Sequence, residues 1–461
     1  DSMDITIIHP AQYKATTNGL LQSETTVANT TTTFFKHRYP IASYLVCFSV
    51  TNFIVFNNAV QLGNVNLPMV TYVYPESIND FQPYTYKVLD AMQLFHNSFG
   101  PYPFIKEKYG HTQFGWGGGM EHQTNSFLVN TDANLMAHEL AHQWFGNKIT
   151  CASWQDIWLN EGFATFGANY YLEKFDTALV QLVYTNHLAN ITSQPNGSVF
   201  VEDTTSVNRI FNSRLSYNKG AYVLRMLRFT LGDSLFFKGL QKYQSDPLLQ
   251  YGFARTADFK RNMEQTSGKN LDYFFAQWIY GEGYPSFTVK WNQNKNNWAK
   301  ISVSEVTSHS SVSFYKTLLA LTFKNAFQQK TIVVQCNSNN DESWADIGFV
   351  ADTVLIDVQK QLISKNNKAI KTTSNNALQN DIKVYPNPVG NVLSISIKNP
   401  SEKKFSVQVY SQLGQLLWQK DYDTLGQDEL LLIPFGKYAK GTYLLKLQAG
   451  NILNFTKKII K

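Results

Sequence analysis

The sequence predicts an α+β protein of several domains, on three observations. Its 461 residues exceed the roughly 100–200 residues of a typical single domain. Hydrophobic residues make up 43% and charged residues only 16%, which is enough apolar surface for large cores and argues against disorder. The pattern also changes along the chain, from period-two alternation to helical spacing and back to alternation.

These changes divide the chain into five expected segments. Residues 1–75 alternate and are rich in β-branched side chains, which indicates a β-sheet domain. Residues 76–284 carry the helical spacing and are expected to form a mixed α/β domain. Residues 285–363 return to strand patterns, typical of a β-sandwich. Residues 364–381 are polar, which indicates a linker, and residues 382–461 form a separate all-β module.

Within the second segment, one short motif points to metal chemistry. His138-Glu139-Leu140-Ala141-His142 lies in a run, residues 135–147, whose apolar spacing predicts a helix. Residues four apart on a helix lie one above the other, so His138 and His142 can hold one metal ion. Glu139 stands beside them, where a general base is needed. Histidines at this spacing are common elsewhere, but the full H-E-x-x-H pattern favours a zinc peptidase site.

A third ligand is expected at Glu161, because catalytic zinc usually has three protein ligands and one open position. The stretch between His142 and Glu161 is long enough for a turn and a second helix that faces the first. The alternative is a solvated helix glutamate. Asp156 has two interpretations: an acceptor that orients a ligand imidazole, or the N-cap of the helix that carries Glu161, which we favour.

Two further stretches of sequence carry motifs that accompany the expected zinc ligands. Gly117-Gly118-Gly119-Met120-Glu121-His122 contains glycines that let a substrate approach the backbone closely, although such runs are often plain loops. Tyr217-Asn218-Lys219-Gly220 opens an expected helix, after a loop predicted over residues 208–216. With the zinc motifs, these stretches resemble the gluzincin aminopeptidases of the aminopeptidase N family. The resemblance covers roughly residues 1–360.

The resemblance implies a thermolysin-like catalytic domain with one Zn²⁺ per chain, held by His138, His142 and Glu161. It implies that Glu139 is the general base and that Tyr217 donates a hydroxyl to the reacting carbonyl oxygen. The expected activity is a zinc-dependent aminopeptidase acting on peptides with a free N-terminus. Two alternatives remain open: an epoxide hydrolase or bifunctional enzyme on the same site, and a secreted surface-binding protein with a degenerate peptidase fold.

The glycine stretch is expected to bind the substrate. By resemblance, Glu121 recognises the free α-amine, Met120 lines the pocket for the first side chain, and Gly118 and Gly119 lie against the substrate backbone. The family has Asn where this chain has His122, which could change the hydrogen bonds around Glu121. The family's N-terminal domain is also longer, so we expect the β-sheet domain here to be partial.

The last module has its own resemblance. Tyr385-Pro386-Asn387-Pro388, Gly441-Thr442-Tyr443 and the basic end at residues 457–461 resemble the C-terminal sorting domains of type IX secretion cargo in Bacteroidetes. This implies the type IX secretion machinery as a partner and a secreted or cell-surface location. The alternative is a carbohydrate-binding or adhesive β-sandwich.

Charge and hydropathy exclude other classes. The net charge of +6 is small for the length and does not indicate a surface that binds nucleic acid. No apolar run is long enough for a transmembrane segment, and no signal peptide opens the chain. The three cysteines indicate no disulfide framework. We expect a monomer.

Overall fold

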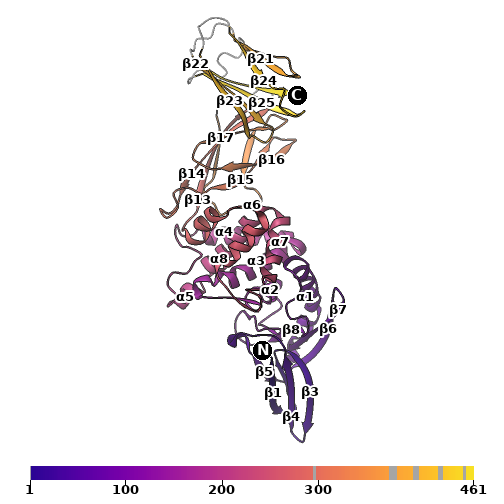
Figure 1. The fold of residues 1–461 in the computed structure, drawn as a ribbon. Coiled ribbons are helices and arrows are strands. Elements are labelled where there is room, and N and C mark those ends of the chain that lie inside the picture. The colour runs from indigo at the N-terminus through magenta and orange to yellow at the C-terminus, as the bar shows by residue number, and fades with distance from the viewer. Residues whose placement is uncertain (1, 294–296, 373–381, 398–403, 424–428, 450–452) are drawn as a thin grey trace. The chain divides into compact units, whose positions relative to one another are not determined.

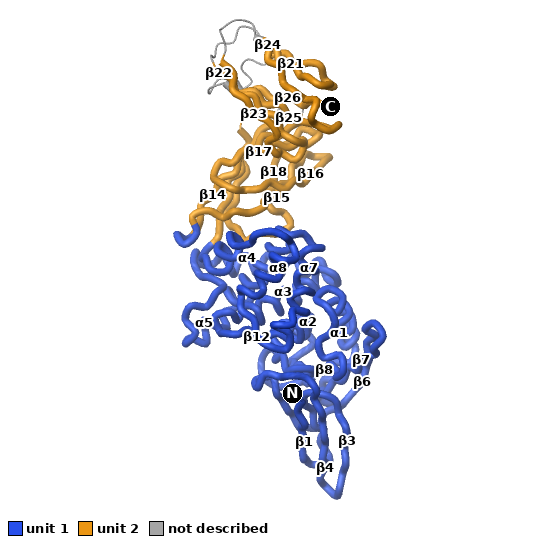
Figure 2. Tube along the Cα trace, in the orientation of Figure 1, with its two compact units in different colours: residues 1–283, 309–312 blue, residues 284–308, 313–461 orange. Residues whose placement is uncertain are grey.

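The computed structural model describes residues 2–293, 297–372, 382–397, 404–423, 429–449 and 453–461. Figure 1 shows a chain of β-sheets and helices in separate regions, as the predicted α+β multidomain class requires. Figure 2 shows the two compact units into which it divides: residues 1–283 with 309–312, and residues 284–308 with 313–461.

The first unit begins with strands. One antiparallel sheet has the order β1-β4-β3, and β2 pairs with β5. The strand bounds are β1 Met3–Pro10, β2 Lys14–Thr17, β3 Leu20–Val27, β4 Thr30–His37 and β5 Phe48–Thr51. Between β4 and β5 lies the short 3₁₀ helix η1, Ser43–Leu45.

The next sheet has the order β6-β7-β8-β10-β9. Its strands are β6 Ile54–Leu62, β7 Val65–Val73, β8 Tyr109–Gln113, β9 Gly119–Met120 and β10 Ser126–Leu128. Strand β7 pairs in parallel with β8, so the sheet crosses the boundary expected at residue 75. That prediction fails for β6 and β7 because alternation reveals a strand but not the sheet it joins.

The helices of this unit follow the predicted spacing closely. They are α1 Ile78–Phe99, α2 Ala133–Ala141, α3 Trp158–Phe175, α4 Thr177–Ile191, α5 Val207–Ile210, α6 Gly220–Leu231, α7 Asp233–Ser245, α8 Thr256–Ser267 and α9 Asp272–Phe275, with π-helical turns η4 Ser213–Lys219 and η5 Ala276–Tyr280. The prediction of a loop at residues 208–216 is wrong. These residues include most of α5 and most of η4, and a side chain caps the start of each, Ser206 for α5 and Asn212 for η4.

Helix α3 is the centre of the first unit. Every residue from Trp158 to Leu172 is buried, so this helix is covered on all sides. Helices α2 and α6 pack against it, and α1 buries an apolar stripe that includes Val88, Met92 and Phe95. None of the described helices is long and apolar enough to cross a membrane.

The second unit is all β. Its first two sheets have the orders β17-β14-β13-β19 and β16-β15-β18. Their strands are β13 Pro285–Gln293, β14 Trp298–Thr307, β15 Thr317–Lys324, β16 Gln329–Cys336, β17 Asp341–Asp346, β18 Thr353–Ile356 and β19 Lys368–Lys371. The linker expected at residues 364–381 therefore contains a strand: polar composition hid β19, whose backbone pairs with β13. Residues 373–381 of that linker lie outside the described part.

Two further sheets, β20-β21-β24 and β23-β22-β25-β26, enclose an apolar core. Their strands are β20 Ile382–Tyr385, β21 Val392–Ile397, β22 Lys404–Ser411, β23 Leu416–Asp423, β24 Glu429–Pro434, β25 Thr442–Ala449 and β26 Leu453–Ile460. Alternate residues of β21 and β22, such as Leu393, Ile395 and Val407, are fully buried, which confirms the β-rich C-terminal region.

Candidate metal and peptide site

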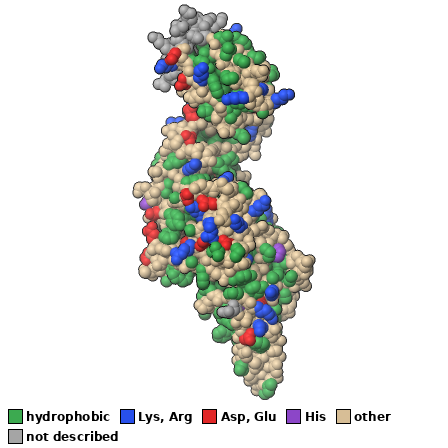
Figure 3. Space-filling view, viewed as in Figure 1, with side chains coloured by type: hydrophobic (Ala, Val, Ile, Leu, Met, Phe, Trp, Pro, Cys, Tyr) green, Lys and Arg blue, Asp and Glu red, His purple; other side chains and the backbone are tan. Residues whose placement is uncertain are grey.

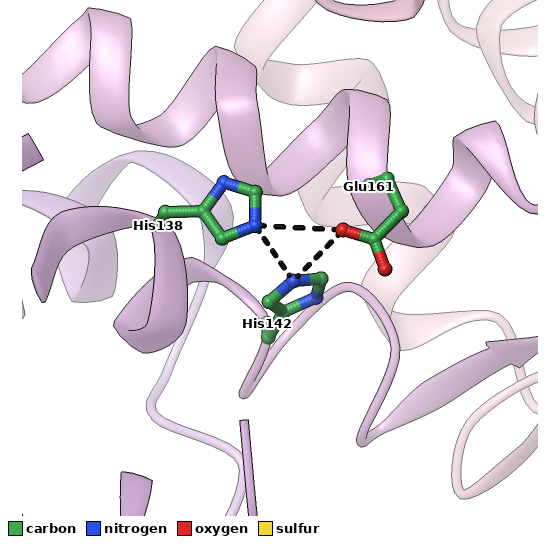
Figure 4. Close-up of side chains that lie close together, drawn as sticks. All are labelled: His138, His142 and Glu161. Carbon is green, nitrogen blue, oxygen red and sulfur yellow. Dashed lines mark hydrogen bonds and ion pairs between the residues drawn. The ribbon is translucent and has the colours of Figure 1, made fainter. Parts of the chain in front are cut away.

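The structure brings the three predicted ligands together. Figure 4 shows the side chains of His138, His142 and Glu161 pointing toward one another. The Nε2 atoms of His138 and His142 lie 3.1 Å apart, and each lies 3.4 Å from Oε2 of Glu161. Ligand atoms about 2.1 Å from one tetrahedral centre would lie about 3.4 Å apart. The donor set therefore has the spacing of a tetrahedral zinc site.

Local geometry explains how the two histidines meet. Helix α2 is capped by Asp132, whose side chain accepts from the backbone N–H of Leu135, and ends at Ala141. It is shorter than the helix expected over residues 135–147, because tighter turns follow and lead to Gly146, with a φ of 124°. His142 keeps helical backbone angles at the C-cap, so the spacing to His138 is preserved.

Hydrogen bonds and charge both prepare this site for a cation. A carbonyl can only accept, so Nδ1 of His142 donates to Phe145 O over 3.0 Å, which leaves Nε2 facing Glu161. Burial by itself would lower the pKa of His142, but Glu121, Glu161 and Glu139 raise it to about 10. Burial would raise the pKa of Glu161, but His142 and His138 lower it to about 2. The buried carboxylates thus favour positive charge at this place, which suits a divalent metal ion.

Glu139 is buried next to this cluster. Its Oε2 has no hydrogen-bond partner among the described residues, which leaves an acceptor available. Burial, together with the charges of Glu121 and Glu161, raises its pKa well above the usual range, although His142 acts in the opposite direction. Gly119 packs directly on it: a Cβ at that position would overlap the Glu139 carboxylate. The glycine is thus explained by close packing.

Glu121 follows β9 directly. Its carboxylate belongs, with Glu139 and His142, to a cluster whose ligand atoms lie within 4.8 Å of one another. Burial raises its pKa, and the Tyr44 hydroxyl lies close enough to lower it. Tyr44 lies on η1 and was not predicted, since an aromatic in a β-like run carries no sequence signal of a site.

The glycine stretch lies at the edge of a β-sheet. Strand β9, which contains Gly119 and Met120, is the last strand of its sheet in the described residues, and Gly118 before it has a φ of 79°. Met120 is half-buried. The structure therefore brings the four residues of the predicted substrate-binding group, Gly118 to Glu121, to the sheet edge beside Glu139.

Tyr217 lies in the π-helical turn η4 rather than in a regular helix. Its ring stacks on that of His138, with centroids 6.1 Å apart and an interplanar angle of 12°. Burial and the Glu161 carboxylate raise its pKa, so the hydroxyl keeps its proton. Helix α3 lies close to the residues after Tyr217 because Gly162 has no side chain. A Cβ on Gly162 would lie 3.0 Å from the backbone of Gly220.

Asp156 does not cap α3. That helix has Ile157 at the N-cap without a side-chain hydrogen bond. The Asp156 carboxylate instead accepts from Thr256, from the backbone N–H at 3.1 Å and from the hydroxyl at 2.6 Å. The favoured prediction was wrong because a carboxylate just before a helix has the same sequence signal whether it caps that helix or a distant one.

Comparison with known proteins identifies the families of two regions. Residues 121–278 match the profile of the peptidase family M1 domain, and residues 383–461 match the secretion system C-terminal sorting domain. This chain is therefore similar to peptidase family M1 over residues 121–278 and to secretion sorting domains over residues 383–461, as both resemblances predicted.

Similar proteins agree with this assignment. Glutamyl aminopeptidase of Rattus norvegicus is 31% identical over 63% of this chain and 33% of its own length. Aminopeptidase 2, mitochondrial, of Saccharomyces cerevisiae is 25% identical over 79% of this chain and 43% of its own length. The chain thus spans well under half the length of these relatives. The solved M1 zinc metallopeptidase of Deinococcus radiodurans has the same fold, with a TM-score of 0.53 and 23% identity over 61% of this chain and 64% of that one.

Proposed function

We propose that this chain is a zinc-dependent aminopeptidase that removes the N-terminal residue from peptides. The observation that carries the proposal is the convergence of His138, His142 and Glu161 beside two further buried carboxylates, Glu139 and Glu121. The first three residues would hold one zinc ion, and the other two remain for proton transfer and for the substrate. The M1 domain and the aminopeptidase relatives support this assignment.

Glu139 and Tyr217 have separate roles in the proposed reaction. A zinc ion bound here supplies Lewis acidity, which polarises the scissile carbonyl and makes water a stronger nucleophile at neutral pH. Glu139 takes the proton of the attacking water and passes it to the leaving amine, because its unpartnered Oε2 is an acceptor with a raised pKa. Tyr217 keeps its proton and donates a hydrogen bond to the carbonyl oxygen as negative charge develops.

Substrate binding sets the cleavage position. An extended peptide adds to the edge of β9, where Gly118 and Gly119 leave room for its backbone and Met120 contacts the first side chain. The Glu121 carboxylate binds the α-ammonium of the substrate. A chain that ends at Glu121 places its first peptide bond beside Glu139, so one residue is released per cycle.

Hydrolysis of amino-acid anilides tests this proposal. The full chain is incubated with leucine, alanine and arginine anilides, and bound zinc is measured on the same sample. We expect turnover, about one zinc per chain, and a loss of roughly 2–4 orders of magnitude in rate with retained zinc for Glu139→Gln. Bound zinc without turnover of any anilide would refute the aminopeptidase, and a protein without zinc would indicate a degenerate binding protein.

We also propose that the sorting domain directs export by the type IX secretion machinery, so that the enzyme acts outside the cell or on its surface. The match over residues 383–461 supports this. Figure 3 shows basic and acidic side chains interspersed on one face. Cell fractionation tests the location: the full chain should leave a host with this machinery, and a chain cut before residue 382 should remain inside. Light scattering of the purified chain tests the expected monomer.

A further inference from the structure

Asn18 is a buried side chain without a role in the chemistry above. It is fully buried in the turn between β2 and β3. Its Nδ2 donates to Gln123 O over 2.7 Å and to Leu45 O over 3.0 Å, and its Oδ1 accepts from Cys47 N over 2.9 Å. One amide thus joins the N-terminal strands to the segment that follows Glu121.

The next residue of the turn strengthens this link. The backbone N–H of Gly19 donates to Thr124 Oγ1 over 3.0 Å. Gly19 has a φ of 77°, and a Cβ there would overlap the backbone of Lys36 in β4. The turn is therefore wedged between β4 and residues 123–124, so its position is determined on both sides.

His122, which departs from the family motif, makes a hydrogen bond to the same carbonyl. Its Nδ1 donates to Leu45 O over 3.2 Å, and its ring packs against Phe127 with centroids 4.8 Å apart. Leu45 O thus accepts from both Asn18 and His122. Leu45 directly follows Tyr44, whose side chain lies close to the Glu121 carboxylate.

Helix α2 and the turns after it hold the other side of this segment. The Gln143 side chain accepts from Thr124 N over 2.9 Å, and Asn147 donates to Glu121 O over 2.7 Å. The Glu121 backbone is thus fixed from this side, while residues 122–124 are fixed from the N-terminal strands. Displacement of either side would turn the Glu121 carboxylate away from the substrate amine.

We propose that Asn18 is a positioning residue for the Glu121 carboxylate: through the carbonyls of Gln123 and Leu45 it sets where the α-ammonium of the substrate binds. The inference rests on the proposed aminopeptidase function and assigns part of amine recognition to the N-terminal strands, outside the matched M1 domain.

The test measures amine recognition separately from metal binding. The full chain is titrated with leucine hydroxamate and with its des-amino counterpart, two zinc-directed ligands that differ only in the α-amine. Asn18→Asp keeps the size of the side chain but turns an oxygen toward two carbonyls. We expect its preference for the amine-bearing ligand to fall about tenfold, as for a misplaced charge-assisted hydrogen bond, with unchanged zinc content and unchanged affinity for the des-amino ligand.

Two variants control the experiment. Asn262→Asp removes an equally buried amide on α8, where Nδ2 donates to Asp246 and to Asp258 O, and should leave the preference unchanged. His122→Phe keeps the packing on Phe127 and removes one donor to Leu45 O, so it should lower the preference in the same direction. If Asn18→Asp does not fold, the result for His122→Phe tests the positioning role.

Each outcome has a definite meaning. An unchanged preference in Asn18→Asp, or in His122→Phe if only that variant folds, overturns the positioning role, as does an equal loss of affinity for both ligands. A wild-type chain without preference for the amine-bearing ligand contradicts the proposed aminopeptidase itself, which separates the two failures.

Discussion

Gly119→Ala is expected to slow catalysis by displacing Glu139, the proposed general base. A Cβ on Gly119 would lie 2.6 Å from Cδ and 2.7 Å from Cγ of Glu139, whereas ordinary carbon contacts lie at about 3.5 Å. The Glu139 side chain would therefore have to move by about 1 Å. A displacement of that size at a reacting group costs roughly 10²-fold in rate.

The assay compares kcat, KM, zinc content and melting temperature of the wild type and two alanine variants. Gly119→Ala should lose roughly 10²-fold in kcat with zinc retained. Gly117→Ala is the matched control, because a Cβ on Gly117 would meet nothing within 4 Å and its backbone is not left-handed; it should behave as wild type. Wild-type kcat in Gly119→Ala would refute the placement of Glu139 against β9, and an effect on KM alone would indicate substrate exclusion instead.

Four further results are expected. Tyr217→Phe should lose roughly 10²–10³-fold in kcat with zinc retained, as for the loss of one hydrogen-bond donor to the oxyanion. An unchanged kcat in steady-state kinetics would show that Tyr217 has only a structural role. Glu121→Gln should weaken leucine hydroxamate far more than its des-amino counterpart, since the amide lacks the charge that binds ammonium. Removing zinc with a chelator should lower the melting temperature and adding zinc should restore it, because a ligand that binds only the folded state stabilises it; an unchanged melting curve would contradict the metal site. Burial raises the pKa of Glu305 from 4.5 to about 7, so between these values the folded state binds more protons and stability falls as pH rises. Glu305→Gln keeps the acceptor for Tyr315 N and should stabilise the protein by at most about 3 kcal/mol at pH 8 and not at pH 4, as measured by urea unfolding at both pH values.

Much of the fold followed from periodicity. Helical spacing was expected over residues 76–284, where the structure has α1, Ile78–Phe99, and α8, Thr256–Ser267. These segments were predictable because one apolar face repeats over several turns and a glycine ends each helix, Gly100 and Gly268. Short elements such as α5 and the turn η4 were missed, since four to seven residues hold too little of a period.

Pairing between strands was the main source of error in the domain boundaries. Strands β6 and β7 lie in the segment expected to form the first β-sheet domain but join the sheet of β8, and β19 lies in a stretch whose composition indicated a linker. Backbone hydrogen bonds make these pairings, and they place few demands on side-chain type. A sequence pattern therefore locates a strand more readily than its partner.

The donor set of the proposed metal site was predictable from the sequence alone. His138 and His142 share a helix face because of the 3.6-residue turn, which is a local property of the chain, and Glu161 was expected from zinc's need for a third ligand. Only the tertiary structure decided what surrounds them. Asn18 and Gln123 are 105 residues apart in the chain, Asp156 binds Thr256 rather than its own helix, and Tyr44 reaches Glu121. Contacts of this kind join side chains to distant parts of the chain, where neither spacing nor composition records the partner.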